Sequence, residues 1–408
     1  MTNPIKNDGA NRVLVTVSGP DTPGITAALA GLIHHNGAQL LDIEQVVVQN
    51  QLTLCLLIEV GGGRSRNEPV LKDLLFTAKD MGLELDFQVI AENTVPANQA
   101  PLRRYAVTAI GDALDAGGVH QVANALAKHN ANIDHIRRLS GDDLQSVEFA
   151  VSLAPEGASE LRRALLQLAA TADFDIALQR ESLSRRAKRL VVMDMDSTLI
   201  QIEIIDEMAR LYGVVDQVQE ITRRAMAGEY AFDDSLRERV KLLGGMPFET
   251  VERLATDLPV TEGAEQLLRV LRALGYKTGV ISGGFTFAAD ALKRRLGLDY
   301  AYANQLEIVD GRLSGRVKEP IVGPQRKADL LDALAQREGI SLEQTIAIGD
   351  GANDLAMLQQ AGLGIAFHAK PKLREAADTS LSRGGLDRIL YLLGLSLDDI
   401  QDFVEPNG

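Results

Sequence analysis

The stretch RLVVMDMDSTLI, which spans Arg189–Ile200, places two aspartates directly after an apolar run. Such a run is typical of a strand buried in a parallel sheet. Asp194 and Asp196 are one residue apart, and side chains alternate along a strand, so both carboxylates should leave its carboxyl end in the same direction. There they can share one metal ion and one substrate. The pair indicates a nucleophile beside a general acid.

The sequence that follows predicts a parallel α/β sheet. Apolar segments alternate with helical ones, and the expected strands are RLVVMD, YKTGVIS, TIAIGD and LGIAF. A mostly helical insert follows the first strand, where a lid over the strand's end would emerge. The expected domains are a Rossmann-like core of residues 188–205 and 259–398 and a helical cap of residues 206–258. Asp310 and Gly311 indicate a β-hairpin on the edge of the sheet.

The first half of the chain contains one pattern twice. VLVTVSGPDTPGITAALAGLIHHNGAQLLDIEQ, from Val13, resembles YAVTAIGDALDAGGVHQVANALAKHNANIDHIRR, from Tyr105. Each copy predicts a strand, a glycine-bearing loop, a helix and a second strand, followed by another strand, a helix and a last strand. We therefore expect two βαββαβ, ferredoxin-like domains at residues 11–91 and 103–181. The proline-containing segment Glu92–Leu102 is typical of an exposed linker.

The composition limits the classes of partner. Lysines and arginines number 42 against 56 aspartates and glutamates in 408 residues, a net charge of −14. This charge gives no general attraction to nucleic acid or to an anionic membrane, and neither is expected as a partner. The single Cys55 excludes an intramolecular disulfide, and the polar start of the chain has no apolar segment for secretion. The longest apolar runs are too short to span a bilayer, so we expect a cytoplasmic protein.

Further candidate residues follow the later strands or begin the helices beside them: Ser282, Gly283, Gly284, Lys327, Asp350 and Asp354. Ligands of open α/β sheets bind outside the carboxyl ends of the strands, so these groups should converge on one crevice. The two glycines allow backbone amides to approach a phosphate oxygen closely. Each residue alone has a purely structural explanation as a turn, a solvated lysine or a helix cap. Their ordered combination at three strand ends favours a site.

The motifs DMDST, ISGG, the lysine and GDGAND, in this order, resemble the haloacid dehalogenase superfamily of phosphotransferases. The resemblance implies that Asp194 attacks phosphorus to give an aspartyl-phosphate. Asp196 would protonate the leaving oxygen and then deprotonate the hydrolytic water. Neighbouring carboxylates should favour the protonated Asp196 that a general acid requires. Ser282 and Lys327 would bind the oxygens of the transferring phosphoryl group.

The same resemblance implies a Mg²⁺ site. The metal would be held by the carboxylates of Asp194 and Asp350 and by the backbone carbonyl of Asp196. Hard oxygen ligands that leave some waters in place suit this ion. Asp354 is expected to orient Lys327 or the waters on the metal.

Within the superfamily, the lead to Glu203 and the residues of the insert resemble the phosphoserine phosphatase family. By that resemblance Glu203 would pair with the substrate's ammonium, and Arg239 would form a bidentate contact with its carboxylate. Met226 and Phe232 would close over its aliphatic part, and Asn353 would complete the contact with the serine moiety. The glycines after Ser282 would join the substrate site. The structural alternative is that Glu203 and Arg239 are solvated cap residues and that Met226 and Phe232 pack within the cap. Asn353 would then only cap a helix.

The duplicated half resembles ACT domains, which are small amino-acid-sensing modules. In this interpretation the loop GPDTPGI binds an amino acid, with Asp21 near its ammonium and Gly24 allowing close approach. The alternative is that these residues only begin a helix. The second copy lacks the proline, which makes Gly117 and Gly118 weaker ligand candidates. ACT domains commonly pair edge to edge, so a homodimer is expected.

The function that these resemblances imply is hydrolysis of O-phospho-L-serine to L-serine and phosphate, the last step of serine biosynthesis, with L-serine as the regulatory ligand. One alternative is a phosphotransferase or phosphatase that acts on another small phosphomonoester, because the same residues would serve. Another is an amino-acid-sensing regulator with an inactive phosphatase fold. The presence of both aspartates, the lysine and Asp350 argues against inactivity.

Overall fold

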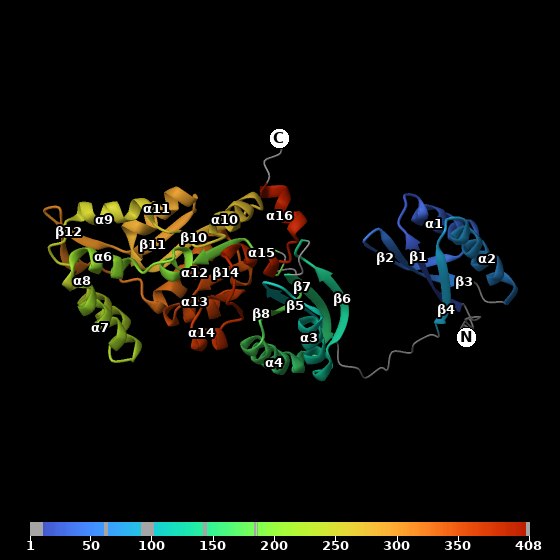
Figure 1. Ribbon diagram of the computed structural model, residues 1–408, viewed down its shortest axis with the longest axis horizontal. Coiled ribbons are helices and arrows are strands. Elements are labelled where there is room, and N and C mark those ends of the chain that lie inside the picture. The colour runs from blue at the N-terminus through green and yellow to red at the C-terminus, as the bar shows by residue number, and fades with distance from the viewer. Residues whose placement is uncertain are drawn as a thin grey trace, which may run out of the picture. The chain divides into compact units, whose positions relative to one another are not determined.

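The computed structural model describes residues 11–60, 64–90, 102–141, 145–182, 185 and 187–404, and the chain divides into two compact units, residues 1–99 and 100–408. The first unit is an antiparallel sheet of order β2-β3-β1-β4 with two helices (Figure 1). Its elements are β1 (Asn11–Pro20), α1 (Ile25–His35), β2 (Gln39–Val48), β3 (Gln51–Val60), α2 (Arg64–Asp80) and β4 (Glu84–Ile90).

The core of the first unit follows from the two-residue period of a strand. Every second side chain of β3 is buried: Leu52, Leu54, Leu56 and Ile58. These residues share one hydrophobic cluster with Leu29 and Ile33 of α1 and Leu74 of α2. The cluster therefore joins one face of the sheet to both helices.

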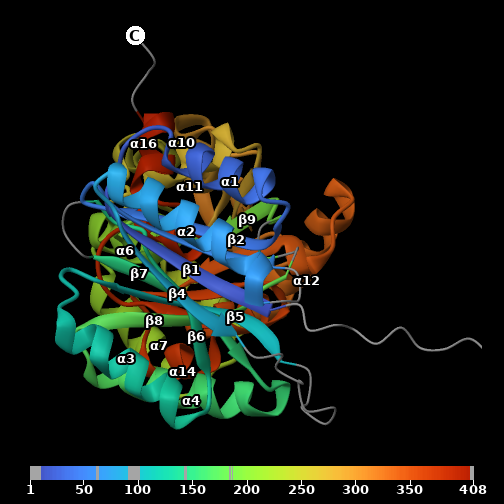
Figure 2. The same cartoon turned by 90° about the vertical axis from the view of Figure 1, so that its right-hand side faces the viewer.

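The second unit begins with the same βαββαβ pattern. Its elements are β5 (Arg103–Gly111), α3 (Ala116–Lys128), β6 (Asn132–Arg138), β7 (Ser146–Leu153), α4 (Ala158–Thr171) and β8 (Phe174–Arg180). The strand order β6-β7-β5-β8 repeats that of the first unit, and α3 and α4 lie side by side on one face of the sheet (Figure 1, Figure 2). The predicted duplication of a ferredoxin-like fold is confirmed.

The predicted parallel sheet is also confirmed, in the order β11-β10-β9-β14-β15-β16. Its strands are β9 (Leu190–Met193), β10 (Lys277–Phe285), β11 (Tyr300–Asn304), β14 (Thr345–Gly349), β15 (Gly364–Phe367) and β16 (Thr379–Leu381). Helices α10 (Ala264–Ala273), α11 (Thr286–Leu296), α12 (Pro324–Glu338), α13 (Leu355–Gln360) and α14 (Pro371–Ala376) connect them. Short helices α15 (Ile389–Leu392) and α16 (Leu397–Val404) follow.

The central strand β9 is buried on both faces, as its apolar run predicts. Leu190 and Val192 pack with α12 and α13, whereas Val191 and Met193 belong to the cluster of α10 and α11. The alternation of a strand therefore divides four consecutive residues between two layers of helices. Its carboxyl end delivers Asp194 to the edge of the sheet.

The insert after β9 is helical, as expected: α6 (Ile204–Tyr212), α7 (Val215–Met226), α8 (Phe232–Leu242) and α9 (Phe248–Leu254). The hairpin prediction is partly wrong. Strands β12 (Leu306–Val309) and β13 (Arg312–Val317) form a separate two-stranded sheet instead of an edge of the main one. The amide of Gly245 donates to the carbonyl of Leu313, so the hairpin is hydrogen-bonded to the segment after α8. None of the described helices combines the length and the apolar character needed to cross a membrane.

The second ferredoxin-like domain is joined to the parallel sheet by hydrogen bonds. Asp175 of β8 accepts from the amide of Ser382, and Gln179 donates to the carbonyl of Leu392. The amide of Leu397 donates to the carbonyl of Leu139. Strand β8 is accordingly buried along most of its length, whereas the equivalent β4 is mostly exposed. The two copies therefore have different surroundings.

Candidate active site

The carboxyl end of β9 places the two aspartates in different settings. Asp194 is buried, and its Oδ1 accepts a hydrogen bond of 2.7 Å from the amide of Met195. Among the described residues, Asp196 receives a single, long bond of 3.4 Å from the amide of Ile204. Burial, followed by the charges of Glu203 and Asp194, raises the pKa of Asp196 well above its usual range. This shift favours the carboxylic acid form of Asp196, and its role as general acid stays a prediction.

Lys327 contacts both Asp194, after β9, and Asp354, after β14. It lies in the first turns of α12, its side chain is completely buried, and its Nζ is 2.8 Å from Asp194 Oδ1 and 2.6 Å from Asp354 Oδ1. Burial lowers the pKa of Lys327, but the two carboxylates outweigh that effect, and its pKa is raised overall. The ammonium is therefore a fixed positive charge beside Asp194. Asp354 contacts this ammonium directly, and the orienting role expected for it stays a prediction.

Three carboxylates form a cluster that fits a divalent cation. Asp194, Asp350 and Asp354 each offer one oxygen, and these oxygens lie within 4.8 Å of one another. Burial, then the charges of Asp194 and Glu203, raises the pKa of Asp350 to about 6, while Thr198 donates to it at 3.2 Å. A cation would relieve this repulsion, and oxygen donors suit hard metals. Lys327 contacts Oδ1 of both Asp194 and Asp354, and no such contact is made to Asp350 among the described residues.

The last residues of β10, where its pairing with β11 is irregular, bring a hydroxyl and two glycines to the same edge. Ser282 is buried, and its Oγ accepts a hydrogen bond of 2.8 Å from the amide of Gly284. A Cβ on Gly284 would lie 2.6 Å from Asp196 Oδ2, so this position has no room for a side chain. Asn304, which the sequence did not single out, donates to the carbonyl of Gly283 at 2.8 Å. Its only signal in the sequence is its place at the end of the short segment Tyr300–Asn304.

The start of the cap brings an acidic and a basic residue within electrostatic reach of each other. Glu203 accepts a hydrogen bond of 2.7 Å from Ser197, whose φ of 57° turns the chain sharply after Asp196. Desolvation, with the charges of Asp194 and Asp206, raises the pKa of Glu203 although its side chain remains accessible. Loss of water lowers the pKa of Arg239, and Glu203 is the strongest of the carboxylates that oppose this shift.

The other predicted substrate residues have different surroundings. The ring of Phe232 lies beside Gly283: a Cβ on this glycine would be 2.8 Å from it. Met226 is 64% exposed and contacts Lys370 through its sulfur at 3.8 Å, so it does not join Phe232. Asn353 Nδ2 is 3.5 Å from Asp194 Oδ2, which places its amide against the predicted nucleophile.

The predicted regulatory residues differ between the two copies. Gly24 begins α1 with a φ of 103°, which favours glycine, and a Cβ on it would meet no described atom within 4 Å. Asp21 is exposed, and its amide donates to the carbonyl of Asn50. Gly118 is buried, its amide donates to Asp115 at 2.8 Å, and a Cβ would lie 3.2 Å from Phe174. Its amide is thus used by the helix cap and is not presented to a ligand.

The fold and this constellation are those of a haloacid dehalogenase-like hydrolase, and the family model of that description matches residues 188–362. ACT domain models match residues 11–88 and 104–179. A HAD family hydrolase from Salmonella enterica serovar Typhi is similar in structure, with a TM-score of 0.62 and 32% identity over 71% of this chain and 98% of that chain. The probable phosphoserine phosphatase from Vibrio cholerae has a TM-score of 0.56 and 37% identity over 74% of this chain and 89% of that one.

Relatives that match nearly the whole chain identify the family. The phosphoserine phosphatase of Streptomyces coelicolor is 44% identical over 393 residues, which cover 95% of this chain and 93% of that protein. The phosphoserine phosphatase of Mycobacterium tuberculosis is 41% identical over 95% of this chain and 94% of its own length. The chain belongs to the phosphoserine phosphatase family and is a phosphoric monoester hydrolase.

Proposed function

We propose that this enzyme hydrolyses O-phospho-L-serine to L-serine and phosphate, the last step of serine biosynthesis, through an aspartyl-phosphate on Asp194. The observation that carries the proposal is the buried Lys327 ammonium, 2.8 Å from the Asp194 carboxylate and beside an Asp196 with a raised pKa. Phosphoryl transfer depends mainly on positioning and charge neutralisation, and these groups supply both. The names of the relatives support the choice of substrate.

In the first step, a carboxylate oxygen of Asp194 attacks the phosphorus and the serine oxygen leaves. Met195 and Lys327 both contact Oδ1 of Asp194, so we assign the attack to Oδ2. Asp196 gives its proton to the leaving oxygen. Asp196 then takes a proton from a water molecule, whose oxygen attacks the phosphorus. Phosphate leaves, and both aspartates return to their starting protonation states.

We propose Mg²⁺ as the metal, held by Asp194, Asp350 and the backbone carbonyl of Asp196. When bound, it would neutralise negative charge on the phosphoryl group. The raised pKa of Asp350 supports this assignment, since burial and two neighbouring carboxylates disfavour its charge in the absence of a cation. Removal of metal with a chelator should abolish phosphate release, and added Mg²⁺ should restore it. Undiminished release after chelation would remove the metal from the proposal.

For substrate choice, we propose that Glu203 pairs with the ammonium of the substrate and Arg239 with its carboxylate. The mutual influence of these two residues on their pKa values supports their closeness at the mouth of the site. Phe232 would cover the aliphatic part from above Gly283. Met226 contacts Lys370 and would have to leave it to reach the substrate. We therefore propose that Met226 contacts the substrate only when the cap is closed.

Phosphate release from a panel of phosphomonoesters tests the whole assignment. O-phospho-L-serine should give a kcat/KM well above those of phosphoethanolamine, which lacks the carboxylate, and of phospholactate, which lacks the ammonium. Product analysis with an added alcohol such as homoserine separates hydrolysis from transfer. Equal rates across the panel, or predominant transfer, would contradict the proposal, and no release at all would favour the regulatory alternative.

We also propose that L-serine binds the first ACT domain and that the protein is a homodimer. The edge strands β2 and β4 carry exposed apolar side chains, Val46, Val47, Val48, Phe87 and Val89, which supports a partner along an edge of this domain. Sedimentation of the full chain tests the dimer, and a monomer at micromolar concentration would contradict it.

Substitution at Gly24 tests the regulatory site. The φ of 103° makes alanine strained there, so Gly24→Ala should weaken inhibition by serine without lowering the rate in its absence. Gly31→Ala is the matched control, because Gly31 lies within α1 and its Cβ would meet no described atom within 4 Å. An unchanged inhibition curve for Gly24→Ala would move the sensor elsewhere.

A further inference from the structure

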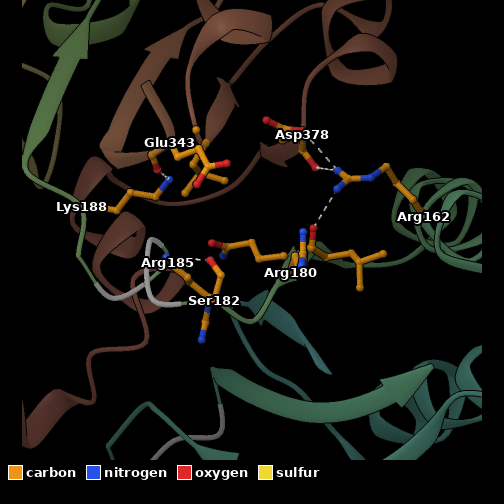
Figure 3. Close-up of a pocket in the computed structure, with 11 residues that line it drawn as sticks. Arg162, Arg180, Ser182, Arg185, Lys188, Glu343 and Asp378 are labelled. Atoms are coloured by element: carbon orange, nitrogen blue, oxygen red, sulfur yellow. Dashed lines mark hydrogen bonds and ion pairs between the residues drawn. The ribbon is translucent and has the colours of Figure 1, made fainter. Parts of the chain in front are cut away.

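A cavity of about 360 Å³ lies where the second ACT domain meets the catalytic domain, and we call it the junction cavity (Figure 3). The ACT domain contributes residues of α4 and β8, the connecting segment contributes three polar residues, and the rest comes from the catalytic domain. Its charged lining residues are Arg162, Arg180, Arg185, Lys188, Glu343 and Asp378.

The junction cavity is at the opposite edge of the sheet from the active site. Lys188 precedes β9, Glu343 precedes β14, and Asp378 precedes β16. The catalytic residues instead follow the carboxyl ends of their strands. Because the strands are parallel, the two sites open at opposite ends of the sheet. A ligand in the junction cavity would therefore not belong to the active site.

The lining holds four basic and two acidic residues, and Arg185 is also paired with Glu148 and Glu181 outside the lining. Asp378 is already used by Arg162, which approaches its carboxylate at 3.5 Å and donates to its carbonyl at 2.7 Å. Within the part of the chain that the structure describes, Arg180 forms no ion pair.

Two of these cations, Arg185 and Lys188, are buried, and their hydrogen-bond partners among the described residues leave a donor or a charge unpaired. Arg185 has a side chain only 5% exposed; it pairs with Glu148 and Glu181, but its Nε has no acceptor among the described residues. Lys188 is 4% exposed and donates to the carbonyls of Glu343 and Thr345 at 2.5 and 3.4 Å.

The ammonium of Lys188 is contacted by backbone carbonyls and not by a carboxylate of the described residues. No carboxylate of the described residues lies within ion-pair distance of its ammonium. Burial lowers the pKa of Lys188 to about 8, although Asp378 and Glu343 act against the shift. Buried cations and N–H groups without partners are costly, and structures usually supply an acceptor. An anion in the junction cavity would supply one for both Lys188 and Arg185.

We propose that the junction cavity binds a small phosphate-bearing anion, either inorganic phosphate or a small phosphomonoester. The guanidinium groups, the ammonium and the hydroxyl of Ser182 offer donors that suit phosphate oxygens. The volume lies near the lower end of small-molecule sites, which are roughly 300–1,000 Å³. The ligand would bridge the ACT domain and the catalytic domain and stabilise their contact.

Calorimetric titration of the full-length, Mg²⁺-loaded protein with inorganic phosphate tests the site. The variants are Lys188→Met and Arg180→Met, and the control is Arg163→Met, an α4 residue beside Arg162 that does not line the cavity. Wild type and control should bind one more phosphate than either cavity variant, or bind it at least about tenfold more tightly. Arg180 is exposed at the end of β8, so its variant carries the test if Lys188→Met fails to fold.

Two further arms identify the source of the phosphate group. O-phospho-L-serine is titrated in an Asp194→Asn background, where it should not be consumed, and L-serine serves as the ligand without phosphate. A site that takes only the phosphomonoester still supports the proposal. Identical phosphate binding in all four proteins, or a site that takes L-serine alone, would overturn it. Phosphate release in phosphate-free buffer should be equal in all four, which separates this result from failure of the proposed function.

Discussion

At the scale of single residues, the site depends on two neighbouring aspartates with different surroundings. Asp194 is held in place by the amide of Met195 and the ammonium of Lys327. Asp196 has lost water and faces other carboxylates, which favour its protonated form. One residue of separation in the sequence therefore gives the two carboxylates different environments, as the proposed roles of nucleophile and acid require.

Asp194→Asn tests the nucleophile. The kcat for phosphate release should fall by at least about a thousandfold, because the amide cannot form the covalent intermediate. The fold should persist, since Lys327 keeps its 2.6 Å contact with Asp354. Asp290→Asn, at an exposed position of α11, is the matched control, and far-UV circular dichroism checks both proteins. A kcat within tenfold of wild type would dismiss the covalent route.

Arg239→Lys tests the contact with the substrate carboxylate. Loss of a bidentate fork costs about 1.5–3 kcal/mol, so kcat/KM for O-phospho-L-serine should fall by roughly 10- to 100-fold. Phosphoethanolamine, which lacks the carboxylate, should be affected far less. Arg237→Lys is the control on the same helix, because Arg237 is exposed and pairs with Asp234 and Glu319. Equal losses on both substrates would exclude Arg239 from specificity.

The sequence predicts those site residues that lie at the ends of expected strands. Asp194, Ser282 and Asp350 follow expected strands, so their convergence can be deduced from the order of strands and loops in the sequence. Asn304 cannot be found in this way, because β11 is not among the expected strands. The hydrogen bond from Ser197 to Glu203 depends on a positive φ that local sequence does not specify for serine.

At the scale of elements, the glycine-containing end of β10 leaves little room for a side chain beside Asp196. Gly284→Ala would place a Cβ 2.6 Å from Asp196 Oδ2 and 2.7 Å from Met195 Cε. We expect kcat to fall by roughly 100-fold, because a displacement of about 1 Å in a catalytic group has an effect of that order. Gly31→Ala is the control, as its Cβ meets no described atom within 4 Å. An active Gly284→Ala enzyme would show that Asp196 tolerates displacement.

Periodicity predicts the four central strands and the helical cap, but not the short outer strands β11 and β16. These strands have few residues each, and β11 carries polar tyrosines, so neither has a strong apolar run. Asp310 and Gly311 predict the hairpin, but they do not predict its partner. The hairpin is hydrogen-bonded to Gly245 of the cap through the carbonyl of Leu313. This is a long-range contact that a local pattern cannot specify.

At the scale of the whole molecule, the two ACT copies have diverged in what they contact. The second copy buries β8 against the catalytic domain, and Arg137 and Arg388 add contacts across this junction, to the carbonyl of Gly394 and to Asp112. The first copy forms a compact unit of its own. The second copy is therefore anchored to the catalytic domain, whereas the amino-acid site proposed at Gly24 belongs to the first.

The pH dependence of stability provides a test of the junction that does not depend on activity. Lys188 has a pKa of about 8 in the folded protein and an ordinary value of 10.5. Between these pH values the unfolded chain carries the proton and the folded protein does not, so the free energy of unfolding should rise with pH. The rise has an upper bound of about 3 kcal/mol, and Lys188→Met should lack it.

Urea denaturation of wild type and Lys188→Met in phosphate-free buffer from pH 7 to 10.5 measures this difference. Subtracting the two curves cancels the other titrating groups, and below pH 8 the difference should be flat, because Lys188 is then charged in both states. A flat difference across the whole range would show that Lys188 keeps its ordinary pKa when folded. An anion bound beside Lys188 would raise the pKa of this lysine. Added phosphate should therefore move the increase in the free energy of unfolding to higher pH in wild type, but not in Lys188→Met.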